Sequence, residues 1–368
     1  MRVLVCGAGV AGLTTAWWLA RHGWDVLLVD RDDRPRDAAH LLDVGGAGYE
    51  VLDRMGVLPA LTALRRNIPA IVYVDQDGDT LATVSYLATA TLLRGRLLTI
   101  MRGDLEATLT AALPSRVQVR RGVTVTTVAD GDDLHGGPVR VTLSDGSTHA
   151  ADALIGADGL HSTVRRLVFG PHRLYVRPLG QHCSTFLFRD DELGRRLGPE
   201  LKVLSLADRQ AGFSRTADGR IAAFLVHRGD RSATDPVAEV RDRCAGMGWV
   251  VDRALAHCPD NLHHAPVSQV ELATWHVGRT VLVGDAAAAV SALAGHGASL
   301  ALLGAFRLAD SLVRSVDLRT GMTSYQQGLL PAVRQVQRAG RRAAGWVAPT
   351  TRWQIAIREA VPALSGSA

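Results

Sequence analysis

The chain contains almost no lysine: Lys202 is the only one among 41 basic residues, so arginine carries the net charge of +5. Aromatic residues make up only 5% of the sequence, and the arginines are scattered rather than gathered into a basic, aromatic-rich patch. Nucleic-acid binding is therefore not expected. The arginine pairs at 65–66, 120–121 and 341–342 are interpreted as solvated faces, although the phosphate of a nicotinamide cofactor could use one of them.

Cysteine is also scarce, and its spacing excludes the usual metal and redox motifs. The four cysteines are Cys6, Cys183, Cys244 and Cys258. They form neither a C-x-x-C pair nor any other ligand spacing, which favours a reduced, cytoplasmic compartment. The neighbouring His263 and His264 have no third ligand close to them in the sequence, so no metal site is predicted.

Only one apolar stretch approaches the length of a membrane span, and glycines interrupt it. Residues Val3 to Ala20 are uncharged, which leaves a signal peptide or a membrane anchor as the alternative interpretation. The apolar pattern, however, continues into a second run that ends on Asp30, which a cleavable leader would not need. We therefore expect no membrane partner. The 368 residues, 47% of them hydrophobic, suit two interwoven domains with a large core.

The first thirty residues read as a complete strand, glycine turn, helix, strand and acid unit. The apolar run 2–6 predicts a strand buried on both faces, and it breaks into a turn that holds Gly7, Gly9 and Gly12. The first glycine permits the tight turn, the second lets the backbone approach a pyrophosphate, and the third lets the helix pack closely. The amino terminus of the helix would face the phosphates, and Asp30 would accept hydrogen bonds from a ribose. This unit predicts dinucleotide binding.

Two further strand patterns end in a glycine beside an acid. Residues 153–156 run into Asp158-Gly159 and a helix start, and a later strand pattern ends at Gly284-Asp285. Three such junctions in this order are hard to explain as ordinary turns. The alternative interpretations remain that Asp158 is a turn residue and that Asp285 caps the following helix.

The segments between these junctions are rich in strand patterns. Hairpin signals join 68–75 to 80–86, and a second hairpin turn follows residue 143. The other strand candidates are 117–120, 123–128, 139–143, 183–189, 201–206, 211–215 and 221–227. Helical patterns cover 102–113, 235–255, a long helix that continues to 312, and a final region at 323–357.

With these junctions in place, the sequence resembles the class A flavoprotein monooxygenases, the para-hydroxybenzoate hydroxylase-like family, over nearly its whole length. It is most similar to short bacterial members that hydroxylate polyketides, antibiotics and related phenols, without the thioredoxin-like extension of the phenol hydroxylases. The fold class that this implies is α/β: a Rossmann-type FAD-binding domain, an interleaved antiparallel β-sheet substrate domain and a C-terminal helical region. Residues 1–66, 101–170 and 276–322 would form the first, 67–100 and 171–275 the second, and 323–368 the third.

The resemblance also implies a set of FAD-binding residues. Arg102 matches the arginine that opens the R-x-x-L helix near the phosphates, although it could be a surface arginine. Asp158, Gly159 and Arg165 match the D-G-x-x-S-x-x-R motif that serves both FAD and the nicotinamide cofactor. The full set is Gly7, Gly9, Ala11, Gly12, Asp30, Arg31, Arg102, Asp158, Gly159, Arg165, Gly284, Asp285, Gly295, Gly297, Ala298 and Ser299. The last four begin a helix whose positive end would stabilise the negative charge of reduced flavin.

Several positions depart from the family pattern. Ala288 and Ala292 stand where histidine and proline are common, Ser299 where asparagine is usual, and Asp37-Ala38-Ala39 where a Pro-Gly-Gly loop is typical. These departures bear on flavin movement. They keep three alternatives open: a flavin dehydrogenase, a cyclase with structural FAD, and a flavin-binding protein without turnover.

The implied reaction uses NAD(P)H as a transient co-substrate to reduce FAD. Oxygen then forms a flavin C4a-hydroperoxide that hydroxylates an aromatic or polyketide-like molecule. No catalytic side chain is identified, and no metal is required. The substrate candidates are His182, Arg215, Phe224 and His227, each of which is as readily a core or solvent-facing residue. We expect a monomer or a homodimer.

Overall fold

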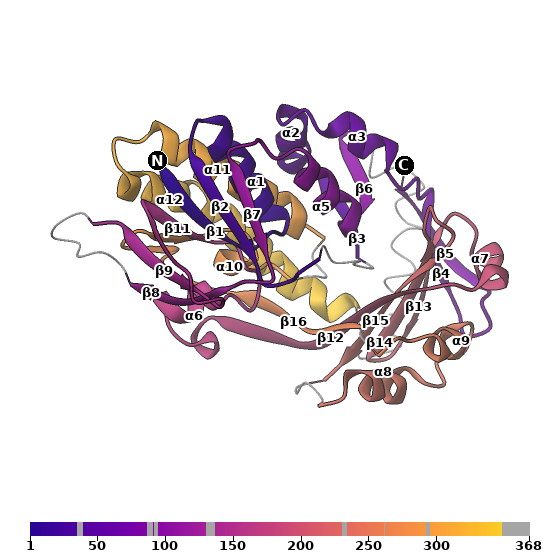
Figure 1. Ribbon diagram of the computed structural model, residues 1–368. Helices are drawn as coiled ribbons and strands as arrows, with labels where there is room; N and C mark the ends of the chain where they lie inside the picture. Colours follow the sequence, from indigo (N-terminus) through magenta and orange to yellow (C-terminus); the bar gives the residue numbers. More distant parts are fainter. Residues whose placement is uncertain are drawn as a thin grey trace.

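The computed structural model describes residues 1–34, 40–86, 91, 95–129, 137–229, 234–260, 262–291 and 295–347. This part of the chain forms a helix-covered parallel sheet and, beside it, a second, mostly antiparallel sheet (Figure 1). The chain crosses between them more than once, because the second sheet takes strands from residues 70–85 and again from 176–270. Of the departures from the family pattern, Asp37-Ala38-Ala39 and Ala292 lie outside the described residues.

The first sheet has the strand order β17-β18-β11-β1-β2-β7, and every neighbouring pair is parallel except β17 with β18. Its strands are β1 (Arg2–Cys6), β2 (Asp25–Asp30), β7 (Val117–Arg121), β11 (Ala153–Gly156), β17 (His276–Val277) and β18 (Thr280–Leu282). In β1, Val3 to Cys6 are at most 2% exposed, which explains why this strand shows no polar alternation. Because β18, β11 and β1 are parallel neighbours, the turns that follow them lie at one edge of the sheet.

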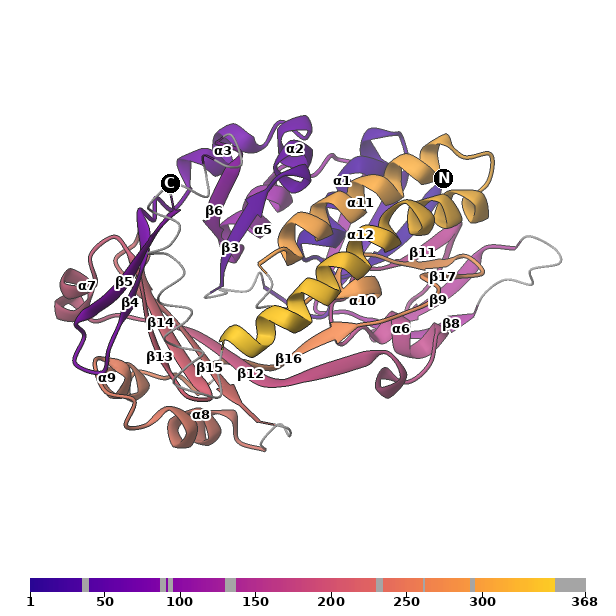
Figure 2. The ribbon, with the colours of Figure 1, turned by 180° about the vertical axis from the view of Figure 1, so that it is seen from behind.

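Helices cover one face of the first sheet, and a small sheet covers the other. Helix α1 packs against α11, which packs against α12, and Figure 2 shows the last two side by side. The small sheet, ordered β10-β9-β8, contacts β1 and β11. The elements of this half are α1 (Val10–Arg21), β3 (Leu41–Gly45), α2 (Ala47–Arg54), α3 (Leu58–Ala63), β6 (Leu97–Met101), α5 (Arg102–Ala111), β8 (Val125–Ala129), β9 (Val139–Leu143), β10 (Thr148–Ala151), α6 (Thr163–Val168), α10 (Asp285–Ala288), α11 (Gly297–Arg314) and α12 (Leu318–Val347).

The second sheet has the order β16-β12-β15-β14-β13-β4-β5, and only the pair β13 with β4 is parallel. Its elements are β4 (Ala70–Val74), β5 (Thr80–Ser85), β12 (Val176–Phe188), β13 (Leu201–Leu206), β14 (Arg209–Arg215), β15 (Ile221–Arg228) and β16 (His263–Val270). Helices α7 (Asp191–Leu197), α8 (Pro236–Cys244) and α9 (Val251–Ala256) cover one face, and a short helix, η1 (His172–Leu174), precedes β12.

The two faces of the second sheet have different neighbours. On the helix-covered face, Phe213, Ala223 and Leu225 share a core with Val240 of α8. The opposite face, which we call the inner face, carries Thr185, Gly212 and Phe224, because residues paired across strands share a face. His40, which precedes β3, lies 3.4 Å from Thr185 through Nδ1 and Oγ1. The inner face is therefore turned toward the first half of the molecule.

Some predicted elements differ from the structure. The helical pattern at 235–255 is two helices, because Gly246 and Gly248 adopt φ values of +68° and +85° that a continuous helix does not allow. The strands β3, β6, β10, β16 and β17 were not predicted. β6 pairs with β3, so a strand assigned to the substrate domain is bonded to one assigned to the FAD-binding domain. The division into domains stays a prediction.

His40 is held between the two halves by several contacts. Its backbone carbonyl accepts a hydrogen bond from Arg102 N at 2.9 Å, and its ring lies 4.8 Å from that of His263. Burial, followed by the nearby His263 and Arg102, lowers the pKa of His40 to about 3. The imidazole is therefore neutral wherever the protein is folded near neutral pH.

We expect the substitution Gly12→Ala to destabilise the fold itself. A Cβ at this position would lie 1.8 Å from the carbonyl oxygen of Gly7, and that oxygen belongs to backbone that cannot move freely. Overpacking of this kind should lower the free energy of unfolding by about 3 kcal/mol, measured by urea denaturation. The control is Gly328→Ala in the exposed middle of α12, where a Cβ meets nothing within 4 Å. It should raise stability by up to about 1 kcal/mol. Equal changes in the free energy of unfolding for the two variants would contradict the close approach of Gly12 to Gly7.

His40 should make stability depend on pH. The folded state keeps this imidazole neutral down to about pH 3, whereas the unfolded chain protonates it below about pH 6.5. The unfolded state therefore binds more protons in this window, and stability falls as the pH falls through it. The variant His40→Gln should lose less stability than the wild type between about pH 7.5 and pH 5. His22→Gln, on an exposed side chain, should behave like the wild type. Identical urea midpoints for His40→Gln and the wild type at both pH values would refute the assignment.

Candidate functional site

The first glycine turn is shaped by close contacts on one side and open space on the other. Gly7 adopts φ +107°, and a Cβ there would lie 2.4 Å from the carbonyl oxygen of Ala157. Gly9 differs, because its backbone is extended and a Cβ would meet only Arg102 and Glu106, at 3.6 and 3.5 Å. Gly7 and Gly12 are therefore required by the chain's own packing. Gly9 instead faces a space bounded by side chains, as expected of a residue that approaches a ligand.

Asp30 ends β2 beside this turn. Its carboxylate accepts hydrogen bonds from Ala8 N at 2.5 Å and from Asp32 N at 2.9 Å. Each carboxylate oxygen keeps a second lone pair, so the group can still accept from a ribose hydroxyl. The next residue, Arg31, is exposed, and its Nε lies 3.7 Å from Asp32 Oδ1.

A hollow next to Gly9 is bordered by both charged and polar side chains. Arg102 donates from Nε to Glu106 Oε1 at 2.8 Å, and the glutamate side chain is only 8% exposed. The pair lies one turn apart on α5, which fixes the guanidinium opposite the glycine turn. The hollow is lined by Ala8, Gly9, Asp30, Asp32, Arg34, Arg102, Glu106, Thr110 and Arg121. Arginine beside free helix N–H groups suits a pyrophosphate, and carboxylates suit a ribose.

The second junction uses its side chains within the protein. The Asp158 carboxylate accepts from Ser162 Oγ at 2.5 Å and from the backbone N–H groups of Thr163 and Val164 at 2.6 and 3.1 Å. Burial raises the pKa of Asp158, and these donors oppose the rise. Gly159 adopts φ +78° in open space. The acid therefore organises the start of α6.

Arg165 joins the second junction to the third. It is fully buried, and its guanidinium donates to the carbonyl oxygens of Leu160 at 2.6 Å and Ala286 at 2.9 Å. Its Nη2 also lies 3.1 Å from His172 Nδ1. Arg165 thus holds α10 against the turn before α6.

The third junction presents a carboxylate that the described residues do not use. Gly284 adopts φ +63°, and a Cβ there would lie 2.7 Å from the Cβ of Ala11, so the first and third turns touch. Asp285 is accessible to solvent, and no described residue gives its carboxylate a hydrogen bond. Desolvation by the surrounding protein raises the pKa of Asp285, and the positive charge of Arg102 opposes this rise. The capping interpretation is not supported, because Asp285 is the first residue of α10 and makes no side-chain cap.

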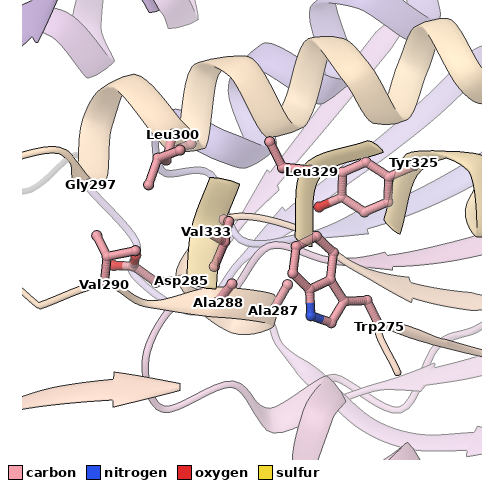
Figure 3. A pocket seen from close by; sticks show the side chains of 12 residues that line it. Trp275, Asp285, Ala287, Ala288, Val290, Gly297, Leu300, Tyr325, Leu329 and Val333 are labelled. Carbon is pink, nitrogen blue, oxygen red and sulfur yellow. The ribbon is translucent and has the colours of Figure 1, made fainter. Parts of the chain in front are cut away.

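The amino terminus of α11 opens next to Asp285. A Cβ at Gly295, which has φ +68°, or at Gly297 would meet nothing within 4 Å, and Ala298 is half-buried. Ser299 Oγ accepts a hydrogen bond from Gly45 N at 3.1 Å, which fixes the helix against β3. Figure 3 shows the pocket in which Asp285 and Gly297 lie with residues of α12. Its lining also includes Ala288, one of the departures from the family pattern.

The structure separates the four substrate candidates. Phe224 is half-buried on the inner face, where its ring occupies the space that a side chain at Gly212 would need. His182 and His227 pair with each other on the helix-covered face. Arg215 pairs with Ile221 on that same face and is exposed. Only Phe224 is therefore retained as a proposed substrate contact.

Sequence reasoning missed several residues of this region. Glu106 follows Arg102 by four positions, and this i,i+4 pairing was the available signal. Arg34 and Arg121 line the hollow but show no motif, because the strand order that brings them there is not written in local sequence. His40 likewise depends on contacts with distant strands.

The arrangement fits FAD. It combines a helix start with a glycine that leaves space for a pyrophosphate, an arginine opposite, an unused carboxylate for hydroxyl groups, and a second open helix start for an anionic ring edge. When bound, FAD supplies the electron transfer and oxygen activation that no side chain here provides. The protein's part is to bind, orient and exclude water.

Comparisons with known proteins agree with this fit. A model of the family described as "FAD binding domain" matches residues 1–339. An uncharacterised protein of Mycobacterium tuberculosis is 34% identical over 332 residues, 88% of each chain. A monooxygenase of Cercospora beticola is 30% identical over 383 residues, 96% of this chain and 89% of that one. The crystal structure of the tetracycline destructase Tet(51) superposes with a TM-score of 0.83 at 25% identity, over 99% of this chain and 96% of that one.

These matches span nearly the whole chain and confirm the predicted fold class, cofactor and type of enzyme. Among the described residues, no helix is long and apolar enough to cross a membrane. The glycine turns, the open carboxylate and the matched sequences lead to one conclusion: the chain belongs to the FAD-binding-domain family of FAD-dependent monooxygenases.

Proposed function

We propose that the protein uses NADH or NADPH and O₂ to hydroxylate an aromatic or polyketide-like small molecule. The observation that carries the proposal is the meeting of three glycine junctions at one sheet edge, with an unused carboxylate and an open helix terminus beside them. Relatives that are named monooxygenases favour it over a dehydrogenase, a cyclase or a non-catalytic flavin protein.

We assign the adenosine and pyrophosphate of FAD to the hollow beside Gly9, with Arg102 opposite the phosphates. We assign Asp285 to the hydroxyl groups of the flavin side chain. The backbone N–H groups at the start of α11, from Gly297 to Ser299, would then face the pyrimidine edge of the ring. Negative charge on the reduced ring would be stabilised there, because a helix amino terminus carries partial positive charge.

The inner face of the second sheet supports an aromatic substrate. Phe224 offers a ring surface, and Gly212 beneath it leaves room for that ring. Its polar neighbours on the same face include Thr185, which pairs with Phe224 across the strands, and Gln210, which donates to Ser205 at 2.9 Å. A mostly apolar wall with a small number of polar groups is typical of sites for small organic ligands.

The nicotinamide cofactor is proposed as a transient co-substrate. The glycine-rich turn after β1 is the single dinucleotide fingerprint in the sequence, and we assign it to FAD. NADH or NADPH would then reach the flavin from the surface, without a nucleotide-binding domain of its own.

The assignment of the pyrophosphate predicts that Gly9→Ala folds but loses FAD. A Cβ at Gly9 makes only ordinary contacts in the protein, at 3.5 Å or more, so stability without FAD should be unchanged. The methyl group would occupy the approach to the phosphates and remove about two charge-assisted hydrogen bonds, which raises the dissociation constant of FAD roughly 100-fold. Fluorescence titration of the FAD-free protein measures this, with Gly328→Ala as the control. Unchanged FAD affinity would place the pyrophosphate elsewhere.

The function itself is tested by anaerobic stopped-flow absorbance. We expect NADH or NADPH to reduce the bound FAD slowly alone and at least about 10-fold faster with the right member of a panel of polycyclic phenols, because a substrate shifts the population of reducible enzyme. Oxygen should then yield a hydroxylated product, detected by mass spectrometry.

Phe224→Ala should weaken the stimulation and raise the KM for substrate while FAD affinity stays the same. Phe188→Ala, on the opposite face, controls for general damage to the sheet. Product formed while FAD stays oxidised would favour the cyclase. Absence of reduction by either cofactor with every panel member would reject the proposed function.

A further inference from the structure

Three histidines and one glutamate meet beneath α8, on the helix-covered face of the second sheet. His264, His182 and His227 lie on the neighbouring strands β16, β12 and β15, and Glu239 reaches them from α8. The ring of His182 stacks on those of His264 and His227, with centroid distances of 5.1 and 5.5 Å. The side chains are at most 9% exposed. We call this group the histidine cluster; the proposed flavin reaction uses none of it.

Three members of the cluster bring one potential metal-ligand atom each close together. His182, His227 and Glu239 each offer one ligand atom, and these atoms lie within 4.8 Å of one another. Zinc bonds to imidazole nitrogen and carboxylate oxygen measure about 2.0–2.2 Å, so two ligands of one ion are about 3.4 Å apart. Small side-chain rotations would close the remaining distance.

The hydrogen bonding of His227 fixes which nitrogen faces Glu239. Its Nδ1 lies 3.2 Å from the carbonyl oxygen of Arg228, which can only accept, so Nδ1 carries the hydrogen. In the neutral ring, Nε2 then has a lone pair and no hydrogen. That atom is buried without a hydrogen-bond partner among the described residues and lies 4.0 Å from Glu239 Oε1. The lone pair of His227 Nε2 therefore lies near the carboxylate in a buried space, where a metal ion could accept it.

His264 holds the other oxygen of the glutamate. Its Nε2 lies 3.3 Å from Glu239 Oε2, and its Nδ1 lies 2.8 Å from Ser184 Oγ. With the serine hydroxyl donating to Nδ1, Nε2 carries the hydrogen and lies near the carboxylate, although the present geometry makes no hydrogen bond between them among the described residues. Outer residues that orient a ligand in this way are usual around metal ions. His264 is thus a positioning residue rather than a ligand.

We propose that His182, His227 and Glu239 bind one divalent transition-metal ion, for which Zn²⁺ is the best match, with water in the remaining position. Two imidazoles and one carboxylate form a known zinc ligand set. The ion would tie α8 to β12 and β15 on the side of the sheet that faces away from His40, so its role is to stabilise the second sheet.

The ligands escaped the sequence analysis because they stand 45 and 12 residues apart, at positions 182, 227 and 239, and meet only through strand pairing. The prediction of no metal site considered the cysteine spacing and the pair His263 and His264, and of this pair only His264 belongs to the cluster.

The test uses the full-length protein with its FAD, free of any affinity tag, after treatment with a chelator. Titration with ZnCl₂ in a calorimeter should show one ion per chain, and thermal unfolding should shift upward by several degrees at saturating zinc. Glu239→Gln and His227→Gln should each weaken zinc binding at least about 10-fold. His263→Gln is the matched control, because this neighbour of His264 faces the inner side, and its zinc affinity should equal that of the wild type.

Cobalt binding distinguishes a specific coordination site from nonspecific binding at the surface. In the wild type, Co²⁺ should give the strong visible absorption of four-coordinate nitrogen and oxygen ligation, and Zn²⁺ should abolish it. FAD content reports whether each variant folds. If Glu239→Gln and His227→Gln both fail to fold, the zinc stoichiometry and the cobalt spectrum of the wild type still test whether the cluster binds one metal ion. Absence of stoichiometric zinc binding, or equal affinity in all variants, would overturn the proposal and leave the cluster as a structural contact between Glu239 and the three histidines.

Discussion

The close approach of α1 to the ends of β1 and β11 governs the rest of the structure. Gly12 lies so near the carbonyl of Gly7 that no other residue fits, and Gly7 in turn lies against Ala157. Because Gly284 touches Ala11, the third turn packs on the same helix. These contacts leave no room for side chains between the three turns. They bring the amino termini of α1 and α10 to one region, and the start of α11 lines the same pocket as Gly284 and Asp285.

The sequence was sufficient for the parts of this arrangement that depend on local chemistry. The buried strands followed from uninterrupted apolar runs, and the turns followed from glycines at positions that need positive φ or close approach, such as Gly7. The family resemblance supplied the fold, which the comparisons confirm. What local chemistry could not supply was the face on which each strand residue lies. Strand alternation correctly places Phe224 on the face opposite to His182 and His227. Which of the two faces α8 covers, however, is decided by packing.

Two acids in similar sequence surroundings show the same limit. Asp158 and Asp285 both follow a buried strand at a glycine, but the helix after Asp158 begins five residues later, at Thr163, and its N–H groups reach back to the carboxylate. Asp285 is itself the first residue of its helix, so its side chain cannot reach those groups. The difference depends on where each helix starts, which residue type alone does not specify. It leaves one carboxylate engaged in the fold and the other open to a ligand.

Strand β16 extends from the histidine cluster to the third junction. At its far end, the backbone N–H of Val270 donates to the carbonyl oxygen of Ala289, just after α10. Gln337 of α12 donates from Nε2 to the carbonyl oxygens of Val270 and Ala289, at 2.7 and 3.1 Å. The strand pairs with β12 over residues 263–266 and again over 268–270, with a register shift between Pro178 and His182 of β12. Strand β16 therefore joins the second sheet directly to α10, whose first residue is Asp285. The proposed substrate wall and the proposed flavin site thus share one strand of backbone.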